Sequence, residues 1–302
     1  MAKKRDLPKQ SIDCEQLEMS QVTTFTVVGD SAASGVGDSL PNGTSFGWAY
    51  YLARSFQDPL VFLNASRPGA KSQEVLEDQI PKVLVHKPNI CGVIVGGNDM
   101  LRNGFNPVKL HNNLRHTLGE LKRTGTTALM LELHDPTKIV PMPKLLAQVL
   151  NRRIDAVNQV TRSVASEYGA ILVNTRNIPE IYNLENWHID RMHPSKMGHQ
   201  RLAAEFRDLL VNSGWSLDRV EIEKVEKRNR KESIIWLLRN GTPWFLKRSV
   251  DLLPAALILM AIEYVNLKLN RVPVAASENV SFASFAVTQD FEELEISELR
   301  VS

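Results

Sequence analysis

A serine, an aspartate and a histidine of this chain stand where they could form one nucleophilic site. Ser31 ends a Gly-Asp-Ser motif that directly follows the apolar run 24–28, and Asp190 and His193 are three residues apart far downstream. An imidazole can accept the proton of a serine hydroxyl, while a nearby carboxylate fixes its tautomer and stabilises its charged form. These residue types favour hydrolysis or acyl transfer through a serine nucleophile.

Two further positions suit the stabilisation of a negatively charged oxygen. Gly69 follows the apolar run 61–64, and Asn98 follows the run 91–95 in a Gly-Gly-Asn-Asp motif. A glycine brings a bare backbone N–H close to a reacting oxygen, and an asparagine amide can donate a hydrogen bond to it. Each motif alone is an ordinary turn, but in combination with Ser31 they indicate an oxyanion hole.

The candidate residues lie in a sequence in which short apolar runs alternate with longer amphipathic segments. The elements that these segments form must bring the residues together. Continuous apolar runs are typical of strands that are covered on both faces, and the alternation indicates repeated βαβ units. We expect strands at residues 24–28, 61–64, 91–95, 128–133 and 170–173. We expect helices at residues 46–56, 72–80, 107–123, 143–168 and 196–211. The predicted fold class is α/β, with an open parallel five-stranded sheet whose loops converge at the carboxyl ends of the strands.

The order of these segments resembles the signature blocks of the SGNH hydrolases, also called the GDSL lipase/esterase family. Ser31, Gly69, Asn98 and His193 match the four letters of the family name, and Asp190 matches the triad acid. Ala32 stands where the family usually has leucine, which is not a catalytic group. The similarity covers about residues 22–214, and a C-terminal extension with the segment Gly-Thr-Pro-Trp-Phe at 241–245 also resembles actinobacterial members.

The resemblance implies a three-layer α/β/α, flavodoxin-like fold and a serine esterase or lipase that works through an acyl-enzyme. Ser31, Asp190 and His193 would be the catalytic triad, and the oxyanion hole would consist of Ser31, Gly69 and Asn98. It implies no metal, no other cofactor, and a small-molecule or lipid ester as substrate. Two alternatives stay open: an acyltransferase that uses the same site on a sugar or lipid hydroxyl, and a catalytically silent scaffold.

Composition narrows the expected partners and location. The 36 basic and 34 acidic residues give a formal net charge of only +2, so no net field favours nucleic acid. Two cysteines argue against a disulfide framework, and the polar N-terminal segment lacks the apolar stretch of a secretory signal. We therefore expect a cytoplasmic protein without a nucleic-acid partner.

The remaining histidines show no spacing that is typical of metal ligands. We expect His111 and His116 on the surface of a helix, His134 at the border of the substrate cleft, and His199 in a structural role.

Four parts are expected along the chain. These are a mobile arm at 1–20, a hydrolase domain at 21–214, a charged linker with a helical appendage at 215–270, and an acidic flexible tail at 271–302. The longest uncharged stretch of the appendage, residues 252–262, is shorter than the roughly 20 residues that cross a bilayer. Residues 233–269 could pack in a homo-oligomer, or could touch a membrane surface through their aromatic and basic side chains.

Overall fold

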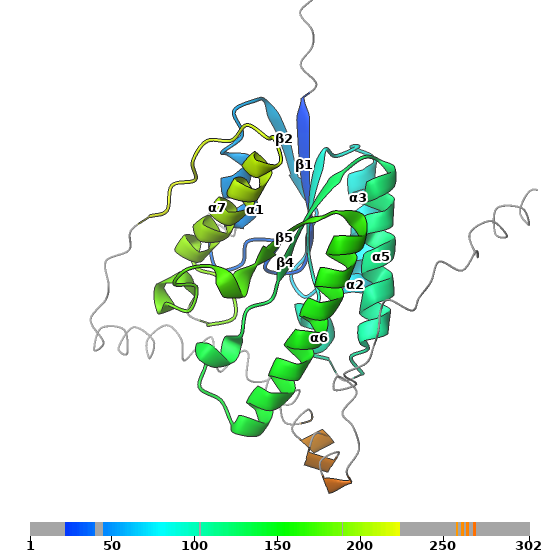
Figure 1. The fold of residues 1–302 in the computed structure, drawn as a ribbon, viewed down its shortest axis with the longest axis vertical. Coiled ribbons are helices and arrows are strands. Elements are labelled where there is room, and N and C mark those ends of the chain that lie inside the picture. Colours follow the sequence, from blue (N-terminus) through cyan, green and yellow to red (C-terminus); the bar gives the residue numbers. More distant parts are fainter. Residues whose placement is uncertain are drawn as a thin grey trace, which may run out of the picture.

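The computed structural model describes residues 22–39, 45–102, 104–188 and 190–223, together with single positions between 258 and 269. Its centre is a parallel five-stranded sheet with the strand order β2-β1-β3-β4-β5 (Figure 1). The strands are β1 (Thr23–Gly29), β2 (Leu60–Asn64), β3 (Ile90–Ile94), β4 (Thr127–Glu132) and β5 (Ile171–Asn174). This is the flavodoxin-like order of a doubly wound fold. The predicted fold class of the hydrolase domain is confirmed, and every strand boundary lies within one residue of the prediction.

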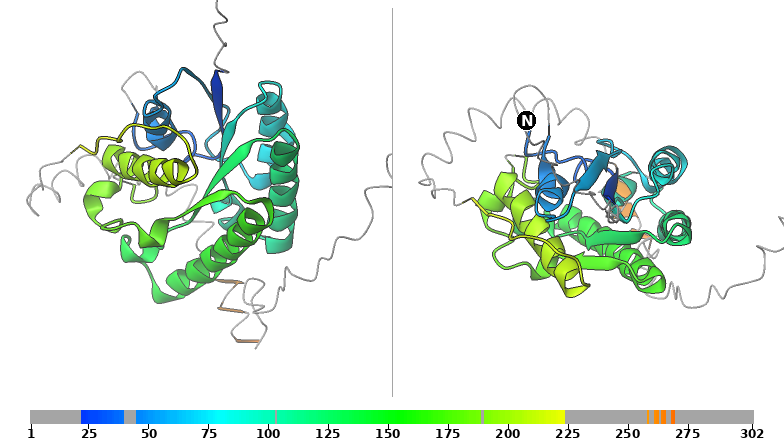
Figure 2. Two further views of the ribbon diagram at one scale, coloured as in Figure 1. Left: turned by 45° about the horizontal axis from the view of Figure 1, so that its top comes forward. Right: turned by 90° about the horizontal axis from the view of Figure 1, so that it is seen from above.

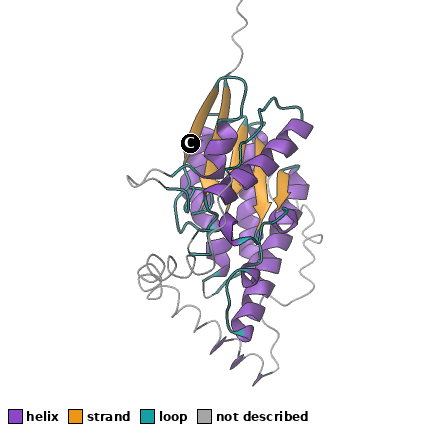
Figure 3. Ribbon diagram, turned by 90° about the vertical axis from the view of Figure 1, so that its left-hand side faces the viewer, coloured by secondary structure: helices purple, strands orange, loops and turns teal. Residues whose placement is uncertain are grey.

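Helices cover both faces of the sheet, as the views from other directions show (Figures 2 and 3). One face carries α1 (Gly47–Ala53) and α7 (Lys196–Asn212), and a core with Trp48 and Phe206 fills the space between them and the sheet. The other face carries α2 (Ser72–Glu74), α3 (Ile80–Leu84), α5 (Pro107–Arg123) and α6 (Lys144–Tyr168). The sheet is therefore the middle of three layers.

Alternate residues of the strands point to alternate layers, as the pleat of a strand requires. In β1, Phe25 and Val27 belong to the core beneath α1 and α7, whereas Val28 belongs to the core beneath α5 and α6. All five residues of β3 are buried. Continuous apolar runs in the sequence reflect this burial on both faces, since neither set of side chains meets water.

Three helical features differ from the prediction. The helix expected at 46–56 already ends at Ala53. The helix expected at 72–80 continues to Leu84, because a π-helical turn (Val75–Gln79) joins α2 to α3 and places Pro81 in the first turn of α3. A proline is tolerated there, since the N–H groups of a first turn have no partner within their own helix. A short helix, α4 (Gly97–Met100), follows β3 and was not predicted.

The described chain continues to pack beyond α7. Leu217 is only 4 % exposed and pairs with Phe56, and the Gln57 side chain donates to Asp218 over 2.8 Å. Residues 215–223 thus adjoin the sheet domain, while the predicted domain boundary at 214 stays a prediction.

Most of the predictions for the two ends of the chain lie outside the described residues. These are the arm at 1–20, the tail at 271–302 and nearly all of the appendage, including the proposed oligomer or membrane contacts of residues 233–269. Within the part of the chain that the structure describes, no helix combines the length and the apolar character that a membrane span requires.

Candidate active site

Three of the predicted site residues follow neighbouring strands at one edge of the sheet. Ser31 lies in the turn after β1, Gly69 in the loop after β2, and Asn98 in α4 directly after β3. Because β1 stands between β2 and β3, the chain leaves it at the point where the strand order reverses. Ligands of doubly wound proteins bind outside the carboxyl ends of the strands at such a point.

The loops after β2 and β3 are tied together by side chains of α4. The Asn98 amide donates to the Ala70 carbonyl over 3.1 Å. The Asp99 carboxylate accepts hydrogen bonds from the backbone N–H and from the hydroxyl of Ser72, the latter at 2.7 Å. Gly69 has a φ of +86°, and a Cβ added to it would meet no atom within 4 Å. This glycine therefore adopts a backbone conformation that other residues rarely adopt, beside open space.

Asp190 and His193 lie in one loop that closes on itself before α7. Trp187 and Pro194 form an isolated antiparallel bridge, and the His188 N–H donates to the His193 carbonyl over 2.9 Å. The Asp190 Oδ1 atom accepts the backbone N–H groups of Met192 at 2.9 Å and of His193 at 3.0 Å. The carboxylate thus fixes the backbone of the loop as well as the ring beside it.

The structure brings Ser31, His193 and Asp190 together in a chain of hydrogen bonds. The Ser31 Oγ atom lies 2.7 Å from His193 Nε2, although 162 positions separate the two residues in sequence. On the other side of the ring, His193 Nδ1 lies 2.8 Å from Asp190 Oδ2. Since the carboxylate accepts the proton on Nδ1, Nε2 is left to take the proton of the serine hydroxyl. This arrangement can activate a serine for attack on a carbonyl carbon.

The Asp190 carboxyl is set up to stay ionised. Burial alone would raise its pKa, but the imidazoles of His188 and His193 and the backbone N–H of His193 hold the pKa well below its usual range. The His188 Nδ1 atom lies 3.2 Å from Asp190 Oδ2, the oxygen that also meets His193. The sequence analysis missed this second imidazole, and its position two residues before Asp190 is the signal that could have found it.

Two further histidines have pKa values that burial lowers strongly, His199 and His134. Both ring nitrogens of His199 are used, since Nδ1 accepts the Trp48 N–H at 3.2 Å and Nε2 donates to the Val36 carbonyl at 3.0 Å. Burial lowers the pKa of His199 to about 4, so the ring is neutral and ties α7 to the turn that contains Ser31. This geometry fits the structural role that the sequence suggested. His134, two residues after β4, packs against Trp187 with ring centroids 3.9 Å apart and ring planes tilted by 38°, and burial lowers its pKa to about 3.

The surface position predicted for His111 was wrong, because the residue is only 2 % exposed. His111 falls within the stripe of α5 that packs on the core, at helical spacing from Pro107, Leu114 and Leu118. Its partner in the prediction, His116, is exposed as expected.

Asp30, the residue before Ser31, has an unusual carboxyl. Burial raises its pKa to about 6, and the nearby Asp99 adds to the effect, although the Ala32 N–H donates to Asp30 Oδ1 over 3.0 Å. A carboxyl that is harder to ionise in the folded chain than in the unfolded chain destabilises the fold at pH values above its folded pKa.

We therefore expect Asp30→Asn to stabilise the protein at high pH. Between pH 4 and pH 6 the folded state holds a proton that the unfolded state has lost, so the free energy of unfolding falls as the pH rises through this window. Asparagine can still accept the Ala32 N–H but never ionises. The melting temperature of the variant should exceed that of the wild type at pH 8, and the difference should shrink towards pH 4. An equal difference at both pH values would contradict this explanation.

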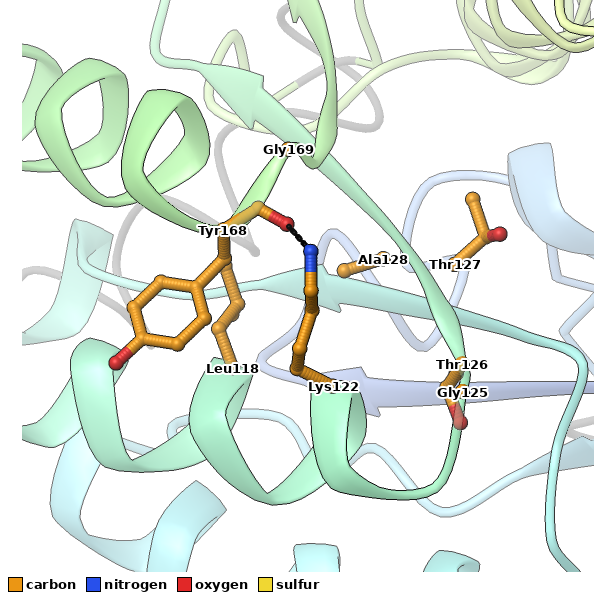
Figure 4. Close-up of a pocket in the computed structure, with 8 residues that line it drawn as sticks. All are labelled: Leu118, Lys122, Gly125, Thr126, Thr127, Ala128, Tyr168 and Gly169. Carbon is orange, nitrogen blue, oxygen red and sulfur yellow. Dashed lines mark hydrogen bonds between the residues drawn. The ribbon is translucent and has the colours of Figure 1, made fainter.

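A separate hollow lies at the opposite edge of the sheet, at the amino ends of β4 and β5 (Figure 4). It has a volume of about 220 Å³, and the Lys122 ammonium donates across it to the Tyr168 carbonyl over 3.2 Å. Gly125 and Gly169, which end α5 and α6, form part of its wall. Because Ser31 lies at the carboxyl ends of the strands, this hollow is no part of the candidate site. Among the described residues, no group of three His, Cys, Asp or Glu side chains gathers to hold a metal ion.

Comparisons with known proteins show which proteins this chain is similar to. The family described as "GDSL-like Lipase/Acylhydrolase family" matches residues 27–201, which is more than half of the chain. The thioesterase 1/protease 1/lysophospholipase L1 of Escherichia coli (strain K12) is 28% identical over 175 residues, covering 57% of this chain and 76% of the relative.

Two solved structures have folds similar to that of this chain. The crystal structure of TesA matches with a TM-score of 0.50 and 27% identity, covering 62% of this chain and 98% of that chain. The lipase/acylhydrolase of Enterococcus faecalis matches with a TM-score of 0.51 and 17% identity, covering 68% of this chain and 100% of that chain. At such low identity the second likeness shows the fold alone.

Proposed function

We propose that this chain, which belongs to the GDSL-like lipase/acylhydrolase family, cleaves carboxylic esters with Ser31 as its nucleophile. Family membership and the thioesterase and lysophospholipase relative support the assignment of the chain as a serine ester hydrolase. The assignment of roles to residues rests on one observation, the hydrogen-bonded chain from Ser31 Oγ through the His193 ring to Asp190 Oδ2.

In the first half of the proposed reaction, Ser31 Oγ attacks the carbonyl carbon of the ester while His193 Nε2 accepts the hydroxyl proton. The π electrons of the carbonyl move to its oxygen, which becomes an oxyanion. When the tetrahedral intermediate collapses, the bond to the leaving group breaks, and His193 returns the proton to the departing alcohol oxygen. An acyl group then remains on Ser31 Oγ.

In the second half, water takes the place of the alcohol. His193 accepts a proton from the water as its oxygen attacks the acyl carbon, and the proton then passes to Ser31 Oγ when the acid leaves. Asp190 stays ionised throughout, because its pKa lies well below the usual range of an aspartate. Its charge stabilises the imidazolium that forms twice in each turnover.

Three donors are assigned to the oxyanion. The backbone N–H of Ser31 donates to no atom of the described part of the chain, while the neighbouring N–H groups of Asp30 and Ala32 are both used. Gly69 presents its backbone beside open space. The Asn98 amide gives one of its two hydrogens to Ala70, which leaves the second for substrate. Losing one such donor typically costs about 3 to 4 kcal/mol of transition-state stabilisation.

The relative from Escherichia coli is named a thioesterase and a lysophospholipase, so acyl groups on small molecules and on lipids are both candidate substrates for this chain. The cytoplasmic location that the sequence suggested stays a prediction.

A fluorophosphonate probe tests the proposal directly. Such a probe forms a covalent bond only with an activated nucleophile, so mass spectrometry of the digested protein should find the adduct on the peptide that contains Ser31. Labelling should parallel the loss of hydrolysis of a short-chain aryl ester. An adduct on a different residue, or full ester hydrolysis after complete labelling elsewhere, would contradict the proposed nucleophile.

A further inference from the structure

The Gln79 side chain makes an unusual contact with the end of the strand that leads to Ser31. Its amide oxygen accepts the Gly29 N–H over 2.7 Å, and its amide nitrogen donates to the Gly29 carbonyl over 3.0 Å. Gln79 is only 3 % exposed. Both hydrogen bonds therefore form away from water, where an unpaired amide would be costly.

Gln79 supplies the acceptor for the Gly29 N–H that a neighbouring strand would otherwise give, while the Gly29 carbonyl also accepts the Arg67 N–H from the loop after β2 over 3.1 Å. The pairing of β1 with β2 ends at Val27 and Asn64, whereas its pairing with β3 continues to Gly29 and Ile94. On the β2 side, Gly29 would be left without a partner for its N–H. The primary amide presents an N–H and an oxygen side by side, as a peptide group does, so its oxygen takes the place of a strand carbonyl beside the Gly29 N–H.

The other side of Gly29 packs closely against the backbone of β3. Gly29 has a φ of +139°, and a Cβ added there would lie 2.0 Å from the Ile94 carbonyl oxygen. The next residue, Asp30, donates its N–H to the same oxygen over 3.0 Å. The exit of β1 is thus held between the backbone of β3 on one side and the Gln79 amide on the other, two residues before Ser31.

A local distortion of the helix accompanies this contact. Gln79 is the last residue of the π-helical turn Val75–Gln79, which interrupts the helical segment between α2 and α3. The extra residue of such a turn rotates the following side chains by about 100° around the helix axis relative to a regular helix. Turns of this kind are frequently found at functional sites.

We propose that Gln79 is a positioning residue for Ser31. Its two hydrogen bonds to Gly29, called the Gln79 clamp below, fix the backbone turn after β1. This turn directs the Ser31 hydroxyl towards His193 and the Ser31 N–H towards the oxyanion. This inference rests on the proposed function, because it assumes that Ser31 is the nucleophile. Gln79 itself does not contact the reacting atoms.

The fold offers a matched control at another strand. Asn158 of α6 is completely buried, and its amide accepts the Leu133 N–H over 2.7 Å and donates to the Leu133 carbonyl over 2.9 Å. This clamp has the same two hydrogen bonds at the exit of β4, a strand whose exit carries no residue assigned to the reaction. Loss of the Gln79 clamp leaves the Gly29 N–H unpaired, while the Gly29 carbonyl still accepts the Arg67 N–H over 3.1 Å. Loss of the Asn158 clamp removes both hydrogen bonds between Leu133 and this side chain. Only the Gln79 clamp precedes the nucleophile.

The experiment compares Gln79→Leu with Asn158→Leu in the full-length chain. We expect both variants to have a lower melting temperature than the wild type. For the folded protein, Gln79→Leu should lower kcat on a short-chain aryl ester by roughly 10- to 100-fold, since small displacements of reacting groups have effects of this size, while KM changes little. The rate of fluorophosphonate labelling should fall in parallel. Asn158→Leu should keep kcat within about twofold, since it displaces no reacting group.

A second variant, Gln79→Glu, keeps the shape and adds a pH readout. A protonated glutamate can donate to the Gly29 carbonyl and accept from its N–H, whereas an ionised one can only accept. The kcat of this variant relative to the wild type should therefore rise as the pH falls. This variant decides the test if Gln79→Leu does not fold.

Two outcomes separate the inference from the function on which it rests. If Ser31→Ala is inactive but both Gln79 variants keep wild-type kcat at every pH, Gln79 is merely structural and the inference is overturned. If Ser31→Ala keeps its activity, the proposed function itself fails, and with it the role given to Gln79.

Discussion

Replacing Ser31 by alanine is expected to remove almost all hydrolysis of a short-chain aryl ester. Without the hydroxyl no acyl-enzyme can form, and the imidazole of His193, 2.7 Å from the missing oxygen, has no proton to accept. In serine hydrolases the loss of the nucleophile lowers kcat by about 10⁶-fold, and the activity that remains comes from the oxyanion donors and substrate binding. We expect a loss of this order, measured as kcat under saturating ester.

The change should act on chemistry and not on folding. Ser31 is only partly buried, and its Oγ atom contacts His193 and not the apolar core. The melting temperature should therefore stay close to that of the wild type. Ser213→Ala provides a control, because Ser213 is exposed after α7 and bonds only to its own helix end. An Ser31→Ala enzyme within about tenfold of the wild type would mean that the reaction uses another nucleophile.

The sequence predicted the sheet well because burial on both faces leaves a clear pattern. Strands β3 and β4 are mostly apolar and mostly buried, and Gly125 and Gly169 mark the ends of two helices with positive φ values. The π-helical turn Val75–Gln79 could not be predicted in this way. It differs from an α-helix in the spacing of its backbone hydrogen bonds, which the pattern of apolar residues does not reveal. For the same reason the extension of this helix past Pro81 was missed.

The candidate site could be predicted as a set of residues but not as a geometry. Topology brings Ser31, Gly69 and Asn98 to the ends of three neighbouring strands, because parallel strands share one carboxyl edge. His193 is different, since it reaches Ser31 from a loop that no strand order fixes. Its position depends on the bridge between Trp187 and Pro194, which periodicity does not reveal.

Buried polar side chains were the least predictable part. His111, His188 and Gln79 all read from sequence as ordinary polar positions. The role proposed for Gln79 follows from its contact with the backbone of Gly29, which lies 50 positions away in sequence. A pattern of apolar residues shows where a core is, but it does not show which polar groups enter that core with partners.

Replacing Asp190 by asparagine is expected to lower kcat by about 10⁴-fold, the size of effect seen when a triad carboxylate is neutralised with its geometry intact. The asparagine oxygen can still accept the N–H groups of Met192 and His193 that Asp190 Oδ1 accepts now. Its NH₂ group, however, would stand where Oδ2 now faces His193 Nδ1. The ring would then carry its proton on Nε2, the nitrogen that must accept the proton of Ser31.

The same substitution should change how stability depends on pH. Because the folded Asp190 has a lowered pKa, the ionised carboxylate stabilises the fold at pH values above the ordinary aspartate pKa of about 3.9, and this contribution is lost as the pH falls further. The wild type should therefore be more stable than Asp190→Asn at pH 7, and the difference should narrow in acid unfolding below about pH 4.

The control is Asp155→Asn, which removes a carboxylate that is 62% exposed and pairs with Arg176 on the surface. Exposed ion pairs contribute little to stability, so this variant should keep both kcat and its acid unfolding profile. If Asp190→Asn kept kcat within about tenfold of the wild type, the carboxylate would not be setting the tautomer of His193. The base would then have to be oriented by another neighbour, and His188, 3.2 Å from the same carboxylate, would be the first side chain to replace.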